Sequence, residues 1–190
     1  YEIVLRIIHP DNSLHFVNTI CTPITDKNGK VVELRGTIQD ITERKQAEDK
    51  LHKSEERFRK LYENSPFGII LNQLITDEQG KPVDFIHLQA NPSAPEHLGM
   101  SSSALVGTKA TEIADEDYAS YFIQKYGAVV KTGKPYEFEY YFNPHDRFLW
   151  VTAFHLIDDL FIATFIDITE RKKLTQSIQE HNDYIETIMA

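Results

Sequence analysis

The sequence predicts an α+β protein that contains one complete unit of strands and helices, the last strands of an earlier unit, and helices that flank them. Two observations support this prediction. Short β-rich segments bounded by turn residues alternate with segments of helical periodicity. In addition, the six residues Asp-Ile-Thr-Glu-Arg-Lys occur twice, at 40–45 and 167–172, each time after β-rich sequence. Only the second copy follows a full set of elements, so we expect the chain to be a piece of a longer protein.

The composition is that of a globular protein. Hydrophobic residues make up 41% and charged residues 26% of the 190 residues, which is enough apolar surface for a packed core. A net charge of −9 argues against a nucleic-acid partner, and no apolar run approaches the roughly 20 residues that cross a bilayer. The single cysteine, Cys21, excludes an internal disulfide and a multi-cysteine metal site. We therefore expect a cytoplasmic protein without direct membrane insertion.

Residues 1–42 are predicted to be the C-terminal strands of a truncated domain. The strands are expected over residues 1–8, 14–24 and 31–41, with turn residues at 10–12 and 26–29. Three strands alone form a thin sheet with an uncovered face, so such a sheet needs a further partner for stability.

Residues 43–63 are predicted to form a connecting helix. They are rich in Glu, Lys, Arg and Gln, carry apolar residues at helical spacing, and contain no Gly or Pro. The pattern leaves open whether one helix is formed or two, because Ser54 is a suitable cap for a second helix. Asn64-Ser65-Pro66 ends the helical segment.

Residues 64–169 are predicted to form the complete domain. Two strands joined by a hairpin turn come first, and they are followed by short helices and turns over 91–114. A longer helix then ends at Gly133 and Pro135. The expected ranges are 67–75 and 83–90 for the first strands, 115–131 for the long helix, and 136–142, 147–157 and 160–168 for the last three strands.

Residues 170–190 are predicted to form an exit helix that leads towards a further module. Its seam residues are spaced by alternating steps of three and four, as in a coiled coil: Arg171, Leu174, Ile178, His181, Ile185 and Ile188. Arg171 and His181 weaken this seam, and the alternative is an amphipathic helix that packs on its own domain. We expect a homodimer that forms through the linker helices.

Four motifs, in this order of elements, resemble the PAS domain, a sensory module of signalling proteins. Residues 54–69 are similar to the family's first helix and strand, and Lys131-Thr-Gly-Lys-Pro135 is similar to the end of its long helix. The central helical motif has its counterpart in Asn91-Pro-Ser-Ala94, Leu98-Gly99 and Leu105-Val-Gly107, and both Asp-Ile-Thr-Glu-Arg-Lys segments resemble the family's exit. The resemblance implies a five-stranded antiparallel sheet with short helices and one long helix on one face.

Catalytic and metal chemistry find little support in the sequence. Neither a Gly-x-Ser-x-Gly elbow nor a Gly-x-x-x-x-Gly-Lys phosphate loop occurs, so we expect no catalytic residues. His145 and Asp146 are interpreted as residues of a turn between strands. His87 and His97 lack a third ligand, and we expect no metal site.

The resemblance allows the family's cofactors to be considered one by one. The flavin–cysteinyl adduct is excluded, because Asn91-Pro-Ser93 has no cysteine at the position that the family uses and Cys21 lies in the wrong unit. Haem is not expected, because residues 108–134 contain no histidine as an axial ligand. A small organic ligand and a solid core remain as alternatives.

The ligand-pocket candidates are aromatic residues of the complete domain together with one histidine: Phe85, His87, Tyr118, Phe122, Tyr140, Trp150 and Phe154. Aromatic side chains are first of all core filler, so a solid core is the competing interpretation. Strand alternation leaves open whether Phe85 and His87 or their neighbours point inward. Trp150 lies in the middle of a strand and is predicted to be buried.

The signal-transmission candidates lie where a last strand becomes a helix: Asp40, Thr42, Asp167, Ile168 and Thr169. An aspartate at this point can anchor the start of the departing helix. The hypothesis is a non-catalytic sensory and dimerisation segment that works with other signalling domains of the same chain, with a histidine kinase as output. The alternatives are a ligand-free protein–protein interaction spacer and the regulatory part of a diguanylate cyclase.

Overall fold

A computed structural model describes residues 2–113, 116–142 and 146–189, with 186, 187 and 189 described by their backbone only. The predictions for Tyr1, Asp115 and His145 therefore lie outside the described residues. The chain divides near Arg59 into two compact units.

The first unit contains a three-stranded antiparallel sheet in the order β1 (Glu2–Ile8), β2 (Leu14–Thr25), β3 (Val31–Asp40). Tight turns join the strands, with left-handed backbone at Asn12 (φ 65°) and Gly29 (φ 79°). Val17 and Thr19 are buried, but many large apolar side chains of this sheet are exposed, among them Ile3, Leu5, Ile20, Leu34 and Ile38. Within the described residues the sheet therefore buries little of its apolar surface.

Helix α1 (Thr42–Glu63) is one unbroken helix, so the structure favours the single-helix interpretation at Ser54. None of its residues is buried. Ion pairs one turn apart support it, with Arg44 Nε 2.9 Å from Glu48 Oε1 and Lys53 Nζ 2.7 Å from Asp49 Oδ2.

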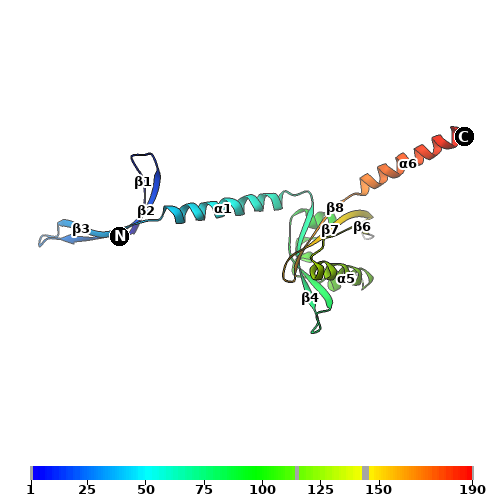
Figure 1. The fold of residues 1–190 in the computed structure, drawn as a ribbon, viewed down its shortest axis with the longest axis horizontal. Coiled ribbons are helices and arrows are strands. Elements are labelled where there is room, and N and C mark those ends of the chain that lie inside the picture. The colour runs from blue at the N-terminus through cyan, green and yellow to red at the C-terminus, as the bar shows by residue number, and fades with distance from the viewer. Residues whose placement is uncertain (1, 114–115, 143–145, 190) are drawn as a thin grey trace. The chain divides into compact units, whose positions relative to one another are not determined.

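The second unit is built on a five-stranded antiparallel sheet in the order β5-β4-β8-β7-β6 (Figure 1). The strands are β4 (Gly68–Thr76), β5 (Pro82–Ala90), β6 (Tyr136–Phe142), β7 (Arg147–Ile157) and β8 (Leu160–Asp167). The neighbouring strands β4 and β8 come from opposite ends of the unit, and their register places Ile70 opposite Ala163. The α+β fold class is thereby confirmed, with both sheets as predicted.

Four helices of the second unit lie between β5 and β6 in the chain: α2 (Ser93–Leu98), α3 (Ser102–Leu105), α4 (Ala110–Ile113) and α5 (Glu116–Thr132). Helix α5 lies against β5 so closely that a Cβ on Gly127 would come 2.3 Å from Pro82 Cγ. A glycine at this position therefore sets how near the long helix can approach the sheet.

Asn91 connects three elements at the start of the second unit. Its side chain is fully buried, and its Oδ1 accepts hydrogen bonds from the N–H groups of Ile69 (2.8 Å) and Ala94 (3.1 Å). Its Nδ2 donates to the carbonyl oxygens of Phe67 (2.8 Å) and Tyr62 (3.1 Å). One amide thus joins the end of α1, the start of β4 and the start of α2.

The core of the second unit lies between the sheet and the helices. Phe161 and Ala153 from the sheet are fully buried, and α5 contributes Phe122, Tyr126 and Val129. A second cluster around Leu105 and Phe165 adjoins it, because Phe138 and Tyr140 pack against both clusters.

The prediction that Trp150 is a core residue is wrong. Strand β7 turns Leu149, Val151 and Ala153 inward, with exposed fractions of 3%, 4% and 0%. Trp150 therefore lies on the opposite face and is 36% exposed, and Phe154 shares its parity on that face. Period-two alternation cannot say which set faces the core, and here the smaller residues fit beneath the helices.

Helix α6 (Thr169–Met189) follows β8 directly. Its predicted seam residues Leu174, Ile178, Ile185 and Ile188 are all exposed in the single chain, by 41% to 65%. This leaves an apolar stripe along the helix without a partner among the described residues.

Phe161→Ala should destabilise the second unit by about 3–5 kcal/mol, because it removes a fully buried ring that contacts Phe85 and Tyr126. Trp150→Ala should cost only about 1 kcal/mol, since that side chain is partly solvent-exposed. Guanidinium unfolding followed by circular dichroism measures both. If both variants lost the same unfolding free energy, the assignment of Phe161 to the core face and of Trp150 to the opposite face would be contradicted.

Candidate functional site

A cavity of about 210 Å³ lies in the core of the second unit, between the inner face of the sheet and the helices. Its wall includes five of the seven predicted pocket residues, Phe85, His87, Tyr118, Phe122 and Tyr140. Trp150 and Phe154 are not part of the wall, because they lie on the other face of β7. A wider depression of about 840 Å³ beside α5 involves no predicted site residue.

Aromatic rings form one side of the cavity. The ring centroids of Tyr118 and Phe122 are 4.4 Å apart, and each lies close to Tyr140, at 5.3 and 5.1 Å. Tyr126 is also part of the wall, and its burial raises the pKa of its hydroxyl well above the ordinary value. The tyrosine is therefore neutral at physiological pH.

Asn72, which is not among the residues predicted from the sequence, is the polar partner of His87 in the cavity wall. The two residues face each other across β4 and β5, and His87 Nδ1 lies 2.7 Å from Asn72 Oδ1. Asn72 Nδ2 donates to the carbonyl oxygen of Ile70 at 3.0 Å. The sequence signal for this residue is a single polar side chain, Asn72, on the same strand face as the apolar residues Ile70 and Leu74.

The electrostatic environment keeps His87 neutral. Burial lowers the pKa of its imidazole to about 4, and the negative charge of nearby Asp84 opposes this only in part. Asp84 is itself buried and accepts a hydrogen bond from the hydroxyl of Thr111 at 2.6 Å. At neutral pH the ring is therefore uncharged and can both donate and accept a hydrogen bond.

The second candidate feature is the junction between β8 and α6. Thr169 Oγ1 accepts a hydrogen bond from the N–H of Phe148 at 2.9 Å, and the N–H of Ile168 donates to the Phe148 carbonyl at 2.8 Å. Asp167 Oδ1 accepts from the N–H of Thr169 at 2.8 Å and so caps the helix start. These bonds fix the first turn of α6 to the start of β7.

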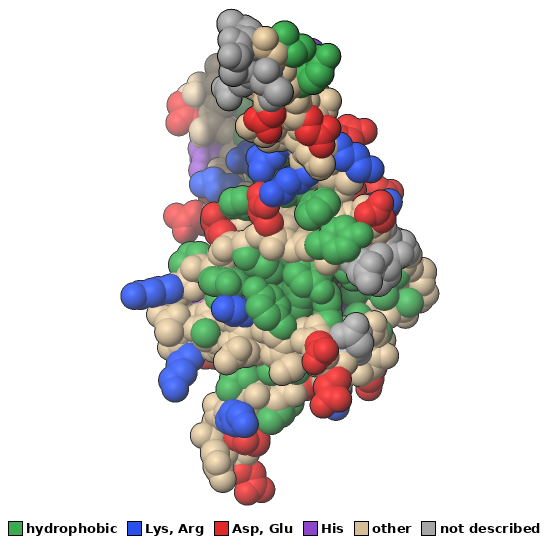
Figure 2. All heavy atoms as spheres, turned by 90° about the vertical axis from the view of Figure 1, so that its right-hand side faces the viewer, with side chains coloured by type: hydrophobic (Ala, Val, Ile, Leu, Met, Phe, Trp, Pro, Cys, Tyr) green, Lys and Arg blue, Asp and Glu red, His purple; other side chains and the backbone are tan. Residues whose placement is uncertain are grey.

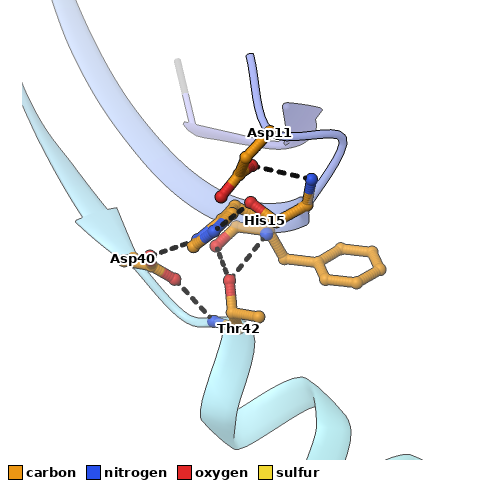
Figure 3. A network of polar contacts seen from close by, with 6 residues as sticks. Asp11, His15, Asp40 and Thr42 are labelled. Carbon is orange, nitrogen blue, oxygen red and sulfur yellow. Dashed lines mark hydrogen bonds and ion pairs between the residues drawn. The ribbon is translucent and has the colours of Figure 1, made fainter. Parts of the chain in front are cut away.

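The same junction is built between β3 and α1 (Figure 3). Thr42 Oγ1 accepts from the N–H of Phe16 at 2.9 Å, and the N–H of Ile41 donates to the Phe16 carbonyl at 2.8 Å. Asp40 Oδ1 accepts from the N–H of Thr42 at 2.8 Å. The structure thus gives all five predicted transmission residues a place in one of two equivalent junctions.

The two junctions differ in the partner of the aspartate's second oxygen. Asp40 Oδ2 lies 2.9 Å from His15 Nδ1, whereas Asp167 Oδ2 lies 3.7 Å from Arg147 Nε. Hydrogen bonds from Thr42 and His15 lower the pKa of Asp40 to about 2. Burial raises the pKa of Asp167, but the Thr169 bonds and the charge of Arg147 outweigh it and lower the pKa overall.

Helix α6 is also tied to the edge strand β6. Glu139 forms ion pairs with Lys172 and, at 3.7 Å, with Arg171, and Lys172 Nζ lies 5.9 Å above the ring of Phe148. Glu139 is the chain neighbour of Tyr140, which lines the cavity from the other face of β6. Strand β6 therefore contacts the cavity through one face and the start of α6 through the other.

Other kinds of site are not apparent in the part of the chain that the structure describes. There, no three His, Cys, Asp or Glu side chains gather as metal ligands, and no helix combines the length and apolarity that membrane spanning requires. Figure 2 shows apolar side chains gathered in the middle of one face, bordered by acidic and basic ones. On this face, acidic and basic side chains are therefore interspersed rather than separated by sign.

Comparisons with known proteins point to one family. A family model described as PAS fold matches residues 74–173, more than half of the chain, and one described as PAS domain matches residues 1–43. A domain of an HTR-like protein from Haloarcula marismortui ATCC 43049 is 22% identical, with a TM-score of 0.43, over 55% of this chain and 100% of that chain.

Two further solved structures are similar. One is a domain of a sensory box sensor histidine kinase/response regulator from Geobacter sulfurreducens, 18% identical, with a TM-score of 0.41, over 62% of this chain and 96% of that chain. The other is the PAS domain of Bordetella pertussis BvgS, 19% identical, with a TM-score of 0.40, over 70% and 98%. No curated protein matches the chain significantly.

The depressed pKa of His87 predicts a loss of stability in acid. Because the folded state resists protonation down to about pH 4 while the unfolded chain protonates near 6.5, unfolding becomes easier as pH falls through this window. The full effect is about 3 kcal/mol. The natural chain should therefore lose more unfolding free energy between pH 7 and pH 4 than His87→Gln does. The difference between the two losses should be about 3 kcal/mol.

The control is His52→Gln on the exposed side of α1, which should keep the natural pH dependence. Fluorescence of Trp150, the single tryptophan, reports unfolding of the sheet that holds His87. Identical pH slopes in the natural chain and in His87→Gln would contradict a buried neutral imidazole.

Proposed function

The chain belongs to the PAS domain family, and on that premise we propose that it is a non-catalytic sensory and dimerisation segment of a signal-transduction protein. It relays the binding of a ligand or partner through helices to an output domain outside this chain. In this proposal residues 64–169 are the sensory domain, while 43–63 and 170–190 are linkers. A histidine kinase output is proposed on the sequence resemblance alone.

The observation that carries the proposal is the duplicated junction. Thr42 and Thr169 make the same hydrogen bond to a strand N–H, at 2.9 Å in both copies, and the preceding aspartates cap the helices at 2.8 Å in both. A helix held in this way cannot rotate without moving the strand that it is bonded to. The junction is therefore suited to carry a displacement of the sheet into a linker helix.

The second unit also offers a route from the cavity to its junction. A ligand that displaces Tyr140 displaces β6, and with it Glu139, whose carboxylate pairs with Lys172 and Arg171 on the first turn of α6. Differential binding of about 1–3 kcal/mol between two arrangements is enough for a useful coupling.

A ligand-free interaction spacer is the second candidate function. The exposed apolar stripes on α1 and α6 favour it, because they are suited to protein contacts whether or not the cavity is occupied. In a spacer, a change inside the cavity would have no consequence for α6.

Hydrogen exchange tests the relay. Ala163→Val adds two methyl groups at the cavity wall and should change amide exchange in residues 169–175, at the start of α6. Ala128→Val adds the same groups on the exposed side of α5 and should leave that segment unchanged. In a Thr169→Val background the response to Ala163→Val should shrink, because the bond to Phe148 is lost.

If Ala163→Val altered exchange only within the sheet, the relay proposal would fail and the spacer would remain. If Thr169→Val left the response at full size, a relay would exist, but the junction would not be its path.

We also propose a second copy of this chain as the partner of the linker helices. The apolar positions Leu174, Ile178, Ile185 and Ile188 recur at coiled-coil spacing on α6 and are exposed. Leu51, Phe58 and Leu61 are likewise exposed on α1, with fractions of 61% to 69%. In a parallel dimer each stripe lies against its own copy and is buried there.

The natural chain should sediment as a dimer at tens of micromolar, and Ile178→Asp with Ile185→Asp should convert it to a monomer by placing charges in the seam. The control, Gln176→Asp with Gln179→Asp, makes the same charge change away from the seam and should stay dimeric. A monomeric natural chain, or a seam variant that remains dimeric, would show that the α6 stripe does not hold two copies together.

A further inference from the structure

The chemistry of the cavity wall restricts what the cavity can hold. None of the described residues that line it is Asp, Glu, Lys or Arg, so the wall offers no counter-charge. A carboxylate or an ammonium ion would lose its hydration there without an ionic partner, which is strongly unfavourable. The wall therefore selects for uncharged molecules.

The aromatic rings and the size of the cavity restrict the ligand further. Tyr118, Phe122 and Tyr140 present ring faces and edges at centroid separations of 4.4–5.3 Å, the arrangement in which another aromatic ring packs well. The volume of about 210 Å³ is below the range of about 300–1,000 Å³ that is usual for drug-sized ligands. The fitting molecule is a small ring system.

His87 adds a directional requirement. Asn72 Nδ2 donates to the Ile70 carbonyl, and reversing this amide would set two oxygens against each other at 3.0 Å. Asn72 Oδ1 therefore faces His87, and because a carbonyl oxygen only accepts, the proton is on His87 Nδ1. The other nitrogen, Nε2, is then an acceptor, and the hydrogen bond that the His87 ring makes to a described residue is the one at Nδ1.

We propose that this cavity binds a small, uncharged aromatic molecule that carries one N–H or O–H donor, and that the donor bonds to Nε2 of His87. The inference rests on the proposed sensory function and specifies its ligand class. Asn72 acts as a positioning residue, since it fixes the tautomer that makes Nε2 an acceptor. The rings of Tyr118, Phe122 and Tyr140 supply the packing surface.

Three indoles tested on the full chain by isothermal titration probe each requirement. Indole should bind, whereas 1-methylindole, which lacks the N–H, should bind about tenfold more weakly, the usual effect of losing one buried hydrogen bond. Indole-3-carboxylate, which is charged at neutral pH, should not bind measurably. This comparison uses the natural chain only, so it does not depend on a variant that folds.

A His87→Phe variant should lose the preference for indole over 1-methylindole, and the control His52→Phe on exposed α1 should keep it. The proposal is overturned if the natural chain binds indole and 1-methylindole equally, binds the carboxylate best, or binds no indole at millimolar concentration. If one of these outcomes were found and Ala163→Val still changed hydrogen exchange at the start of α6, the ligand class would be rejected but the relay proposal would be retained. Indole binding without that response would reject the relay instead.

Discussion

The antiparallel pairing of β4 with β8 is the contact on which the second unit depends. These strands begin and end the unit, and their register sets Ile70 opposite Ala163 and Asn72 opposite Phe161. With that register fixed, the inward parity of both strands is fixed too, and so is the surface on which α5 packs. The cavity lies over this pair of strands, because Ile70, Asn72 and Ala163 belong to its wall. On its other side β8 pairs with β7, and that register brings Asp167, at the end of β8, opposite Leu149, near the start of β7, where α6 begins.

A polar pair inside an apolar core requires a reason, because burial of an amide and an imidazole is costly unless their hydrogen bonds are made. Asn72 and His87 satisfy each other across neighbouring strands, and Asn72 also uses the Ile70 carbonyl. An apolar pair of the same size would need no such bonds, and under the ligand proposal made above the polar pair serves to orient the bound molecule.

Much of the fold could be predicted from the sequence because its signals are local. Turn residues and helical periodicity gave the order of strands and helices, and the repeated six residues indicated both junctions before their bonds were known. The inward direction of β7 could not be predicted, because Trp150 suggested one parity and Leu149 with Val151 the other. Packing against the helices decides between them. Asn72 was missed for a related reason: its role appears only when β5 brings His87 beside it.

The two junctions show which contacts of the repeated motif are the same in both copies. Both copies have the threonine hydroxyl on a strand N–H and the aspartate on the threonine N–H, with matching distances. What differs is the outer partner of the aspartate, His15 in one copy and Arg147 in the other. Arg147 also donates to the Glu96 carbonyl at the end of α2. The helix anchor is therefore common to both copies, whereas the outer contact links each junction to different surroundings.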